Sequence, residues 1–322
     1  DSCFVIAFFM LFGFPNINAM NQADLASSFG VPCQSADFPL LKFNESLVFP
    51  QDESLHRPED GKALADGRIV VADEKSGLRV IEQDGTSRPF GKFPAGLFEP
   101  GEKGPTSATN GVFLESDGAH LLMTDVYAGK IYRIDTRTES VEMIYQHEYG
   151  INSVIRDRKG NVWFTQSTKN PPDNFMALYD SINRPKPDGA VFVLRKSGDG
   201  FAKRAETAAA DIYFANGLTL NNSETKMFVA ETMMDRILVF DVDPVKLTLS
   251  GRKTYAYVLT PDNLAVDSRD NLVAASPLSN SVIAVDRKCK STHTIFSAPS
   301  PENSAAQNKW AVSYTHLRAH ET

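Results

Sequence analysis

The chain has 322 residues, of which 42% are hydrophobic and 23% charged, with a formal net charge of −7. This composition excludes disordered, collagen-like and disulfide-dense chains. The acidic balance provides no positive field for phosphate backbones, so we expect no nucleic-acid partner. A single core normally stops growing at roughly 250–300 residues unless the fold grows by repetition.

The first residues predict an export signal. An apolar stretch, FVIAFFMLFGF at 4–14, is followed by PNINA at 15–19. This pattern is typical of the h-region and cleavage site of a signal peptide, here assigned to residues 1–19, with a buried N-terminal strand as the alternative. The stretch is shorter than the ~20 residues that span a bilayer, and we expect no transmembrane span. An oxidising compartment would favour joining Cys33 to Cys289, and two free thiols remain the alternative.

The last residues, AVSYTHLRAHET at 311–322, have neither strand alternation nor any relation to what precedes them. We interpret this segment as a non-native tail. A single folded domain is therefore expected over residues 40–310.

Between the two ends, five segments follow one template: a small or polar residue, an apolar strand, a turn, and a second strand rich in β-branched and aromatic residues. The segments begin at Glu59, Asn110, Asn152, Asn216 and Asp262. Three of them carry a glycine, at 67, 118 and 160, where a tight hairpin needs a positive φ. A third strand is expected at 77–81, 130–134, 190–194, 236–240 and 281–285.

Short, evenly spaced strands with turn signals predict an all-β architecture. Repeats of this length arranged in a ring predict a β-propeller, which also absorbs the length without a second domain. We expect six blades. The sixth would combine a strand near residues 45–49 with strands after Lys290, and would be incomplete because the recognisable chain stops near Trp310. A five-bladed ring is the alternative.

The five opening residues predict a metal site. In a propeller the first strand of each blade lines the central channel, so residues that precede these strands converge at one mouth. All five carry side-chain oxygen, and none carries sulfur or imidazole. Carboxylate and amide oxygens suit Ca²⁺ and suit zinc poorly. At any single position the alternative is an ordinary turn residue.

Several runs in these segments resemble the senescence-marker-protein/gluconolactonase superfamily, which includes calcium-dependent lactonases, paraoxonases and strictosidine-synthase-like proteins. The runs are FANGL at 214–218, VAET at 229–232 with DRI at 235–237, PDNLAVD at 261–267 and GNVWFT at 160–165. The resemblance covers about residues 47 to 286. It implies a six-bladed propeller with a calcium ion in the channel mouth.

Matched motif by motif, the resemblance places the calcium ligands at Glu59, Asn152, Asn216 and Asp262. The adjacent acid Asp60 resembles the second member of the Glu-Asp pair of paraoxonases. Substrate contacts are assigned to Asp60, Asn110 and Asn263, with a structural role as the alternative for Asn110.

The implied activity is hydrolysis of lactones or aryl esters by a secreted enzyme, with the metal polarising the carbonyl. Asp262 is the first candidate to activate water or to attack, and His147 is a second candidate base. The stretch TDVY at 124–127 lacks the His pair of paraoxonases. The calcium set, which strictosidine synthases lack, favours a hydrolase. The alternatives are a strictosidine-synthase-like or phosphotriesterase-type enzyme, and a non-catalytic binding platform with structural calcium.

A long insertion at 167–188 lies between the second and third strands of the Asn152 segment. Counting strand directions places it on the same face as the metal. Helical spacing of Phe175, Leu178, Tyr179 and Ile182 predicts a short amphipathic helix that acts as a lid or packs on the rim. Phe175 and Tyr179 are assigned to substrate contact, and their apolar face favours acyl or aryl groups.

Overall fold

The computed structural model describes residues 33, 35–42, 49–50, 54–100, 107–174 and 176–297. The predictions for the signal peptide, the tail and Phe175 lie outside the described residues. In the described part of the chain, no helix is long and apolar enough to cross a membrane.

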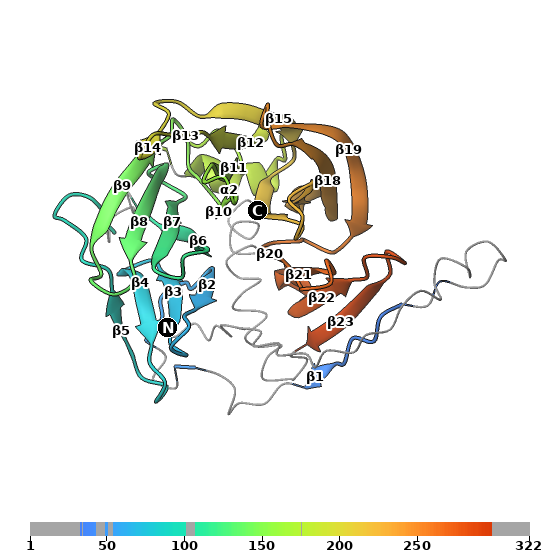
Figure 1. Ribbon diagram of the computed structural model, residues 1–322, viewed down its shortest axis with the longest axis horizontal. Helices are drawn as coiled ribbons and strands as arrows, with labels where there is room; N and C mark the ends of the chain where they lie inside the picture. The colour runs from blue at the N-terminus through green and yellow to red at the C-terminus, as the bar shows by residue number, and fades with distance from the viewer. Residues whose placement is uncertain are drawn as a thin grey trace, which may run out of the picture.

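Five antiparallel sheets are arranged around a common centre (Figure 1). Blade 1 contains β2 (Gly61–Ala63), β3 (Ile69–Asp73), β4 (Gly77–Ile81) and β5 (Ser87–Phe90). Blade 2 contains β6 (Thr109–Leu114), β7 (His120–Asp125), β8 (Lys130–Asp135) and β9 (Val141–Gln146). Blade 3 contains β10 (Val154–Arg156), β11 (Val162–Gln166), β12 (Gly189–Leu194) and β15 (Glu206–Ile212).

Blade 4 contains β16 (Ala215–Leu220), β17 (Lys226–Glu231), β18 (Arg236–Asp243) and β19 (Thr248–Tyr257). Blade 5 contains β20 (Leu264–Val266), β21 (Leu272–Ser276), β22 (Ser281–Val285) and β23 (Thr292–Ser297), with β1 (Leu41–Lys42) paired in parallel to β23. The remaining elements are a small hairpin of β13 (Lys196–Ser197) and β14 (Gly200–Phe201), the helix α2 (Met176–Asn183), and the short helices η3 (Thr232–Met234) and η4 (Pro277–Ser279).

The prediction of an all-β propeller is confirmed, whereas the predicted blade count is not. The described residues form five blades, and the strand that follows Lys290 is the fourth strand of blade 5, so its assignment to a sixth blade was wrong. The physical reason is the turn at Asp286, whose Oδ1 accepts the backbone N–H groups of Lys288 and Cys289 at 2.7 and 2.6 Å. This turn folds β23 back onto β22.

The core lies between neighbouring blades, because each sheet must bury its apolar faces. Between blades 3 and 4, Trp163, Val191, Leu218 and Phe240 belong to one buried cluster. The second strand of blade 3, β11, is buried at all five positions. This packing holds the innermost strands, and with them the channel mouth, at fixed spacing.

Neighbouring blades are in close contact at residues that follow three of the opening residues. In blade 2, Gly111 N donates to Asn152 O of blade 3 at 2.9 Å. In blade 4, a Cβ on Gly217 would lie 2.5 Å from Asp262 O of blade 5. Asn263 makes the link from blade 5 to blade 1, since its Nδ2 donates to Glu59 O at 3.0 Å.

We therefore expect Gly217→Ala to destabilise the protein by about 1–3 kcal/mol, because the methyl group forces blades 4 and 5 apart at their point of contact. Gly200→Ala is the matched control, since no atom lies within 4 Å of its added Cβ. Denaturant unfolding of both variants measures the difference. Equal stability of the two variants would contradict this account of the blade contact.

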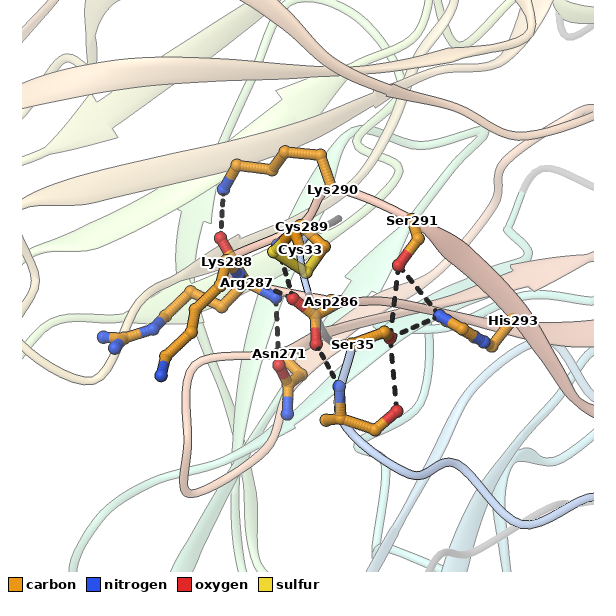
Figure 2. Close-up of a disulfide and its surroundings, with 11 residues drawn as sticks. Cys33, Ser35, Asn271, Asp286, Arg287, Lys288, Cys289, Lys290, Ser291 and His293 are labelled. Atoms are coloured by element: carbon orange, nitrogen blue, oxygen red, sulfur yellow. Dashed lines mark hydrogen bonds between the residues drawn. A yellow bond between two sulfur atoms is a disulfide. The ribbon is translucent and has the colours of Figure 1, made fainter. Parts of the chain in front are cut away.

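A disulfide ties the start of the described chain to blade 5 (Figure 2). Cys33 and Cys289 are bonded, with 5.6 Å between their Cα atoms, so the disulfide alternative is the one the structure adopts. Ala36 N donates to Asp286 Oδ2 at 2.8 Å, and Ser35 Oγ lies 2.7 Å from His293 Nε2. We call residues 33 and 35–42 the strap.

Candidate metal centre in the channel mouth

The predicted ligands lie at the inner ends of four blades. Glu59, Asn152 and Asp262 each stand two residues before a first strand, and Asn216 is the second residue of β16. Figure 1 shows β2, β6, β10 and β20 nearest the centre of the ring. The side chain of Asn216 hydrogen-bonds that of Asp262, and the charge of Glu59 acts on Asp262. The structure thus brings blades 1, 4 and 5 together at this point.

The donor atoms of this cluster fit a hard cation. Asn152 Oδ1, Asn216 Oδ1 and Asp262 Oδ1 are buried and have no hydrogen-bond partner. Buried polar atoms without partners are rare and costly, and three of those in the described residues lie on predicted ligands, where an oxygen-binding cation would fit. All three are carbonyl or carboxylate oxygens, the ligand type that Ca²⁺ prefers.

The environment of Glu59 and Asp262 disfavours the charged form of both carboxylates. Burial raises the pKa of Asp262 well above its ordinary value, and the nearby Glu59 and Asp60 raise it further, against Arg57 and the Asn216 hydrogen bond. Burial likewise raises the pKa of Glu59, and Arg57 opposes this shift. A divalent cation between the carboxylates would relieve both penalties.

These raised pKa values predict how stability depends on pH in calcium-free protein. A raised folded-state pKa stabilises the fold fully below the unfolded-state value, about 4, and that stability is lost as pH rises through the folded-state pKa. We therefore expect the melting temperature of EDTA-treated protein to fall toward neutral pH more steeply in wild type than in Asp262→Asn. Calcium at 100 times its Kd should stabilise wild type by about 2.7 kcal/mol. The same calcium concentration should stabilise it more at pH 7 than at pH 5, because carboxylate ligands must be deprotonated to bind.

Thermal scans at both pH values, with and without calcium, measure this difference. An equal calcium effect at pH 5 and pH 7 would contradict the assignment of carboxylate ligands.

Threonine hydroxyls from the second strands fix the backbone of two ligands. Thr124 Oγ1 donates to Asn152 O at 2.7 Å, and Thr165 Oγ1 donates to Asn216 O at 2.7 Å. In each pair the threonine belongs to the blade that precedes its partner. The position of each amide ligand is therefore set by the neighbouring blade.

The residues predicted to contact substrate carry bonds between or within blades. Asp60 Oδ2 accepts Val112 N of blade 2 at 2.9 Å, and Asp60 Oδ1 lies 3.1 Å from Lys62 Nζ. Asn110 is buried, and its Nδ2 donates to Asn152 O at 3.2 Å. Like Asn263, these side chains border the ligand set, and the bonds described here hold the ring together.

His147 lies among aromatic rings. Its centroid is 4.6 Å from that of Phe192 and 5.2 Å from that of Phe164, and its Nε2 is 3.1 Å from Gln166 Oε1. Burial lowers the pKa of His147, against the opposing effects of its Gln166 hydrogen bond and of Glu148. The structure brings it to this aromatic cluster and shows no contact between it and the ligand set.

The predicted helix in the insertion is present as α2. Leu178 of α2 packs in one buried cluster with Val126 and Tyr127 of blade 2 and with Phe214 of blade 4. The hydroxyls of Tyr127 and Tyr179 lie 2.6 Å apart. The helix therefore packs against residues of blades 2 and 4.

A second group of possible metal ligands lies at the β6–β7 turn, the opposite end of blade 2. Glu115, Asp117 and His120 offer atoms within 4.8 Å of one another. Arg133 and Arg156 pair with Glu115 at 2.9 and 2.6 Å. Because these guanidinium groups already balance the buried carboxylate, this group lacks the unsatisfied oxygens of the channel mouth.

Sequence reasoning missed Arg57, which lies 3.7 Å from Glu59, and the two threonines. Thr124 and Thr165 recur 13 or 14 residues after the opening residues of their segments, a register that the template could have shown. For Arg57 the only signal was a cation two positions before a predicted ligand.

Comparison with known structures and families agrees with this fold. A gluconolactonase from Xanthomonas campestris is 20% identical, with a TM-score of 0.56 over 77% of each chain. Regucalcin from Agrobacterium tumefaciens, described as a calcium-binding protein, is 12% identical, with a TM-score of 0.58 over 81% of this chain and 80% of its own. A search of curated protein sequences finds no match to this chain.

The sequence profile of one family matches residues 137–306, which is just over half of the chain. The matched segment includes the FANG and PDN motifs with Asn216 and Asp262. The chain belongs to the SMP-30/Gluconolactonase/LRE-like family.

Proposed function

We propose that the protein is a calcium-dependent hydrolase of lactones or carboxylic esters. The observation that carries this proposal is the set of three buried, unpartnered oxygens on Asn152, Asn216 and Asp262, beside the carboxylate of Glu59. The family, together with a calcium-binding protein and a gluconolactonase among the structures of similar fold, supports it.

Glu59, Asn152, Asn216 and Asp262 would hold the ion, which supplies Lewis-acid polarisation of a carbonyl oxygen. Asp262 is the proposed residue that accepts a proton from water or attacks the carbonyl carbon. Asn216 orients Asp262 through their hydrogen bond. The apolar residues of α2 exclude water from the mouth and favour acyl or aryl groups on the substrate.

We also propose that the protein acts outside the reducing cytoplasm. The Cys33–Cys289 disulfide supports this proposal, because such bonds persist in oxidising compartments.

The test is hydrolysis of phenyl acetate and of γ-butyrolactone after EDTA treatment and again after calcium is restored, with circular dichroism recorded in parallel. We expect chelation to abolish hydrolysis while the fold persists, and calcium to restore it. Loss of fold on chelation would favour structural calcium. If neither compound were hydrolysed at saturating calcium, the enzymatic proposal would fail in favour of a binding platform.

A further inference from the structure

The loop before β2 brings a cation into the channel mouth. Arg57 Nη2 lies 3.7 Å from Glu59 Oε2. The loop is anchored at His56, since His56 N donates to Asp73 Oδ2 at 2.7 Å and Glu74 N donates to His56 O at 2.9 Å. Arg57 itself has a φ of 43°, a left-handed conformation that a long side chain rarely adopts. The loop thus fixes the guanidinium beside a predicted ligand.

The guanidinium is only partly engaged. A separation of 3.7 Å exceeds hydrogen-bond distance, so the Glu59 contact is an attraction between charges. Arg57 Nη1 is buried and has no hydrogen-bond partner, while 33% of the side-chain surface stays exposed. A buried charged donor without an acceptor costs free energy, which a ligand oxygen would recover.

Arg57 is also influenced by residues on and around α2. Burial lowers the pKa of its guanidinium, and the nearby Glu59, Tyr127, Tyr179 and Glu74 outweigh burial and raise it. Glu59 is a predicted ligand and Tyr179 belongs to α2, so both this ligand and this helix are near enough to influence Arg57. A substrate bound beside Glu59 and beneath α2 meets the Arg57 guanidinium.

The charges around Arg57 leave its guanidinium free to bind an anionic group of a ligand. A divalent cation would offset the carboxylates of Glu59 and Asp262, and Asp60 is already paired with Lys62 at 3.1 Å. Glu74 acts on Arg57 more weakly than Glu59 does. The metal-loaded mouth therefore presents an arginine whose planar, forked donors match a carboxylate.

We propose that Arg57 binds a carboxylate carried by the substrate, so that the enzyme selects lactones or esters bearing an acid group. This inference rests on the proposed hydrolase function and adds a specificity-determining residue to it. The alternative is that Arg57 only balances the charge of Glu59.

The test compares two γ-lactones that differ at one ring substituent, a carboxylate in one and a primary amide in the other. At saturating calcium, we expect wild type to prefer the acid, and Arg57→Gln to reduce the acid-to-amide ratio of kcat/KM by roughly tenfold to a hundredfold. Arg57→Lys should retain part of the preference. Arg137 is exposed at the opposite end of blade 2. Arg137→Gln makes the same change in charge and should retain the full preference for the acid.

If Arg57 only balanced the charge of Glu59, Arg57→Gln would change calcium affinity and would change kcat/KM for both lactones by the same factor. An unchanged acid-to-amide ratio of kcat/KM in Arg57→Gln therefore overturns the proposal. Absence of preference for the acid in wild type overturns it as well, while hydrolysis of the amide still upholds the proposed function. If neither lactone is hydrolysed, the proposed function fails, and calorimetry with benzoate decides the role of Arg57. Equal benzoate affinity of calcium-loaded wild type and Arg57→Gln would overturn the inference.

Discussion

Asp262→Asn is expected to reduce calcium-dependent hydrolysis by roughly a thousandfold or more while the propeller stays folded. The change removes one anionic ligand and the proposed proton acceptor, yet it keeps the shape of the side chain. Because burial and Glu59 raise the pKa of Asp262, the variant should be at least as stable as wild type without calcium at neutral pH.

Steady-state kinetics at saturating calcium, calcium titration by calorimetry and thermal scans measure the three parts of this prediction. Asp199→Asn is the matched control, because Asp199 is exposed in the β13–β14 turn and should retain both activity and calcium affinity. Wild-type turnover in Asp262→Asn would refute the assigned role. Wild-type calcium affinity combined with lost turnover would keep Asp262 as a catalytic group and remove it from the ligand set.

Loss of the Cys33–Cys289 bond should produce the largest change in stability. The two cysteines are 256 positions apart. In the chain-entropy description, closing so long a loop lowers the entropy of the unfolded chain and thereby stabilises the folded protein by about 5 kcal/mol. Without the bond, the strap keeps the Ala36 and Ser35 hydrogen bonds and its short pairing with β23. We expect both Cys33→Ser and the Cys33→Ser, Cys289→Ser pair to unfold at markedly lower guanidinium concentration than wild type.

Wild type treated with reductant should match the double variant, whereas the double variant itself should not respond to reductant. Unfolding midpoints within error of wild type would show that the bond does not limit the unfolded chain. If Cys33→Ser were far less stable than the double variant, the extra loss of stability would point to a harmful free thiol at Cys289.

The local parts of this fold could be predicted from the sequence. Turn glycines such as Gly67, Gly118 and Gly160 have positive φ values as expected, and the predicted third strands are present in all five blades. These features depend on neighbouring residues alone. A metal site could be predicted because residues with side-chain oxygen recur at one register, and the family resemblance then selected the ligands among them. That three of their oxygens lack a hydrogen-bond partner became visible only in three dimensions.

The parts that escaped prediction depend on contacts between distant residues. A strand after the Asp286 turn could complete blade 5 or begin another blade, and only pairing with β22 settles which. Asn263 and Glu59 are 204 positions apart, so nothing local indicates their hydrogen bond. His147 shows the same limit, because its aromatic neighbours Phe164 and Phe192 come from a different blade.

The spread of the ligands along the chain has a consequence for biosynthesis. Glu59 belongs to the first blade and Asp262 to the fifth, so the last ligand leaves the ribosome some two hundred residues after the first. Synthesis runs from the N-terminus, so the residues of the first four blades emerge before Asp262 is available. The proposed calcium site is therefore one that the nascent chain completes late, once the fifth blade has docked.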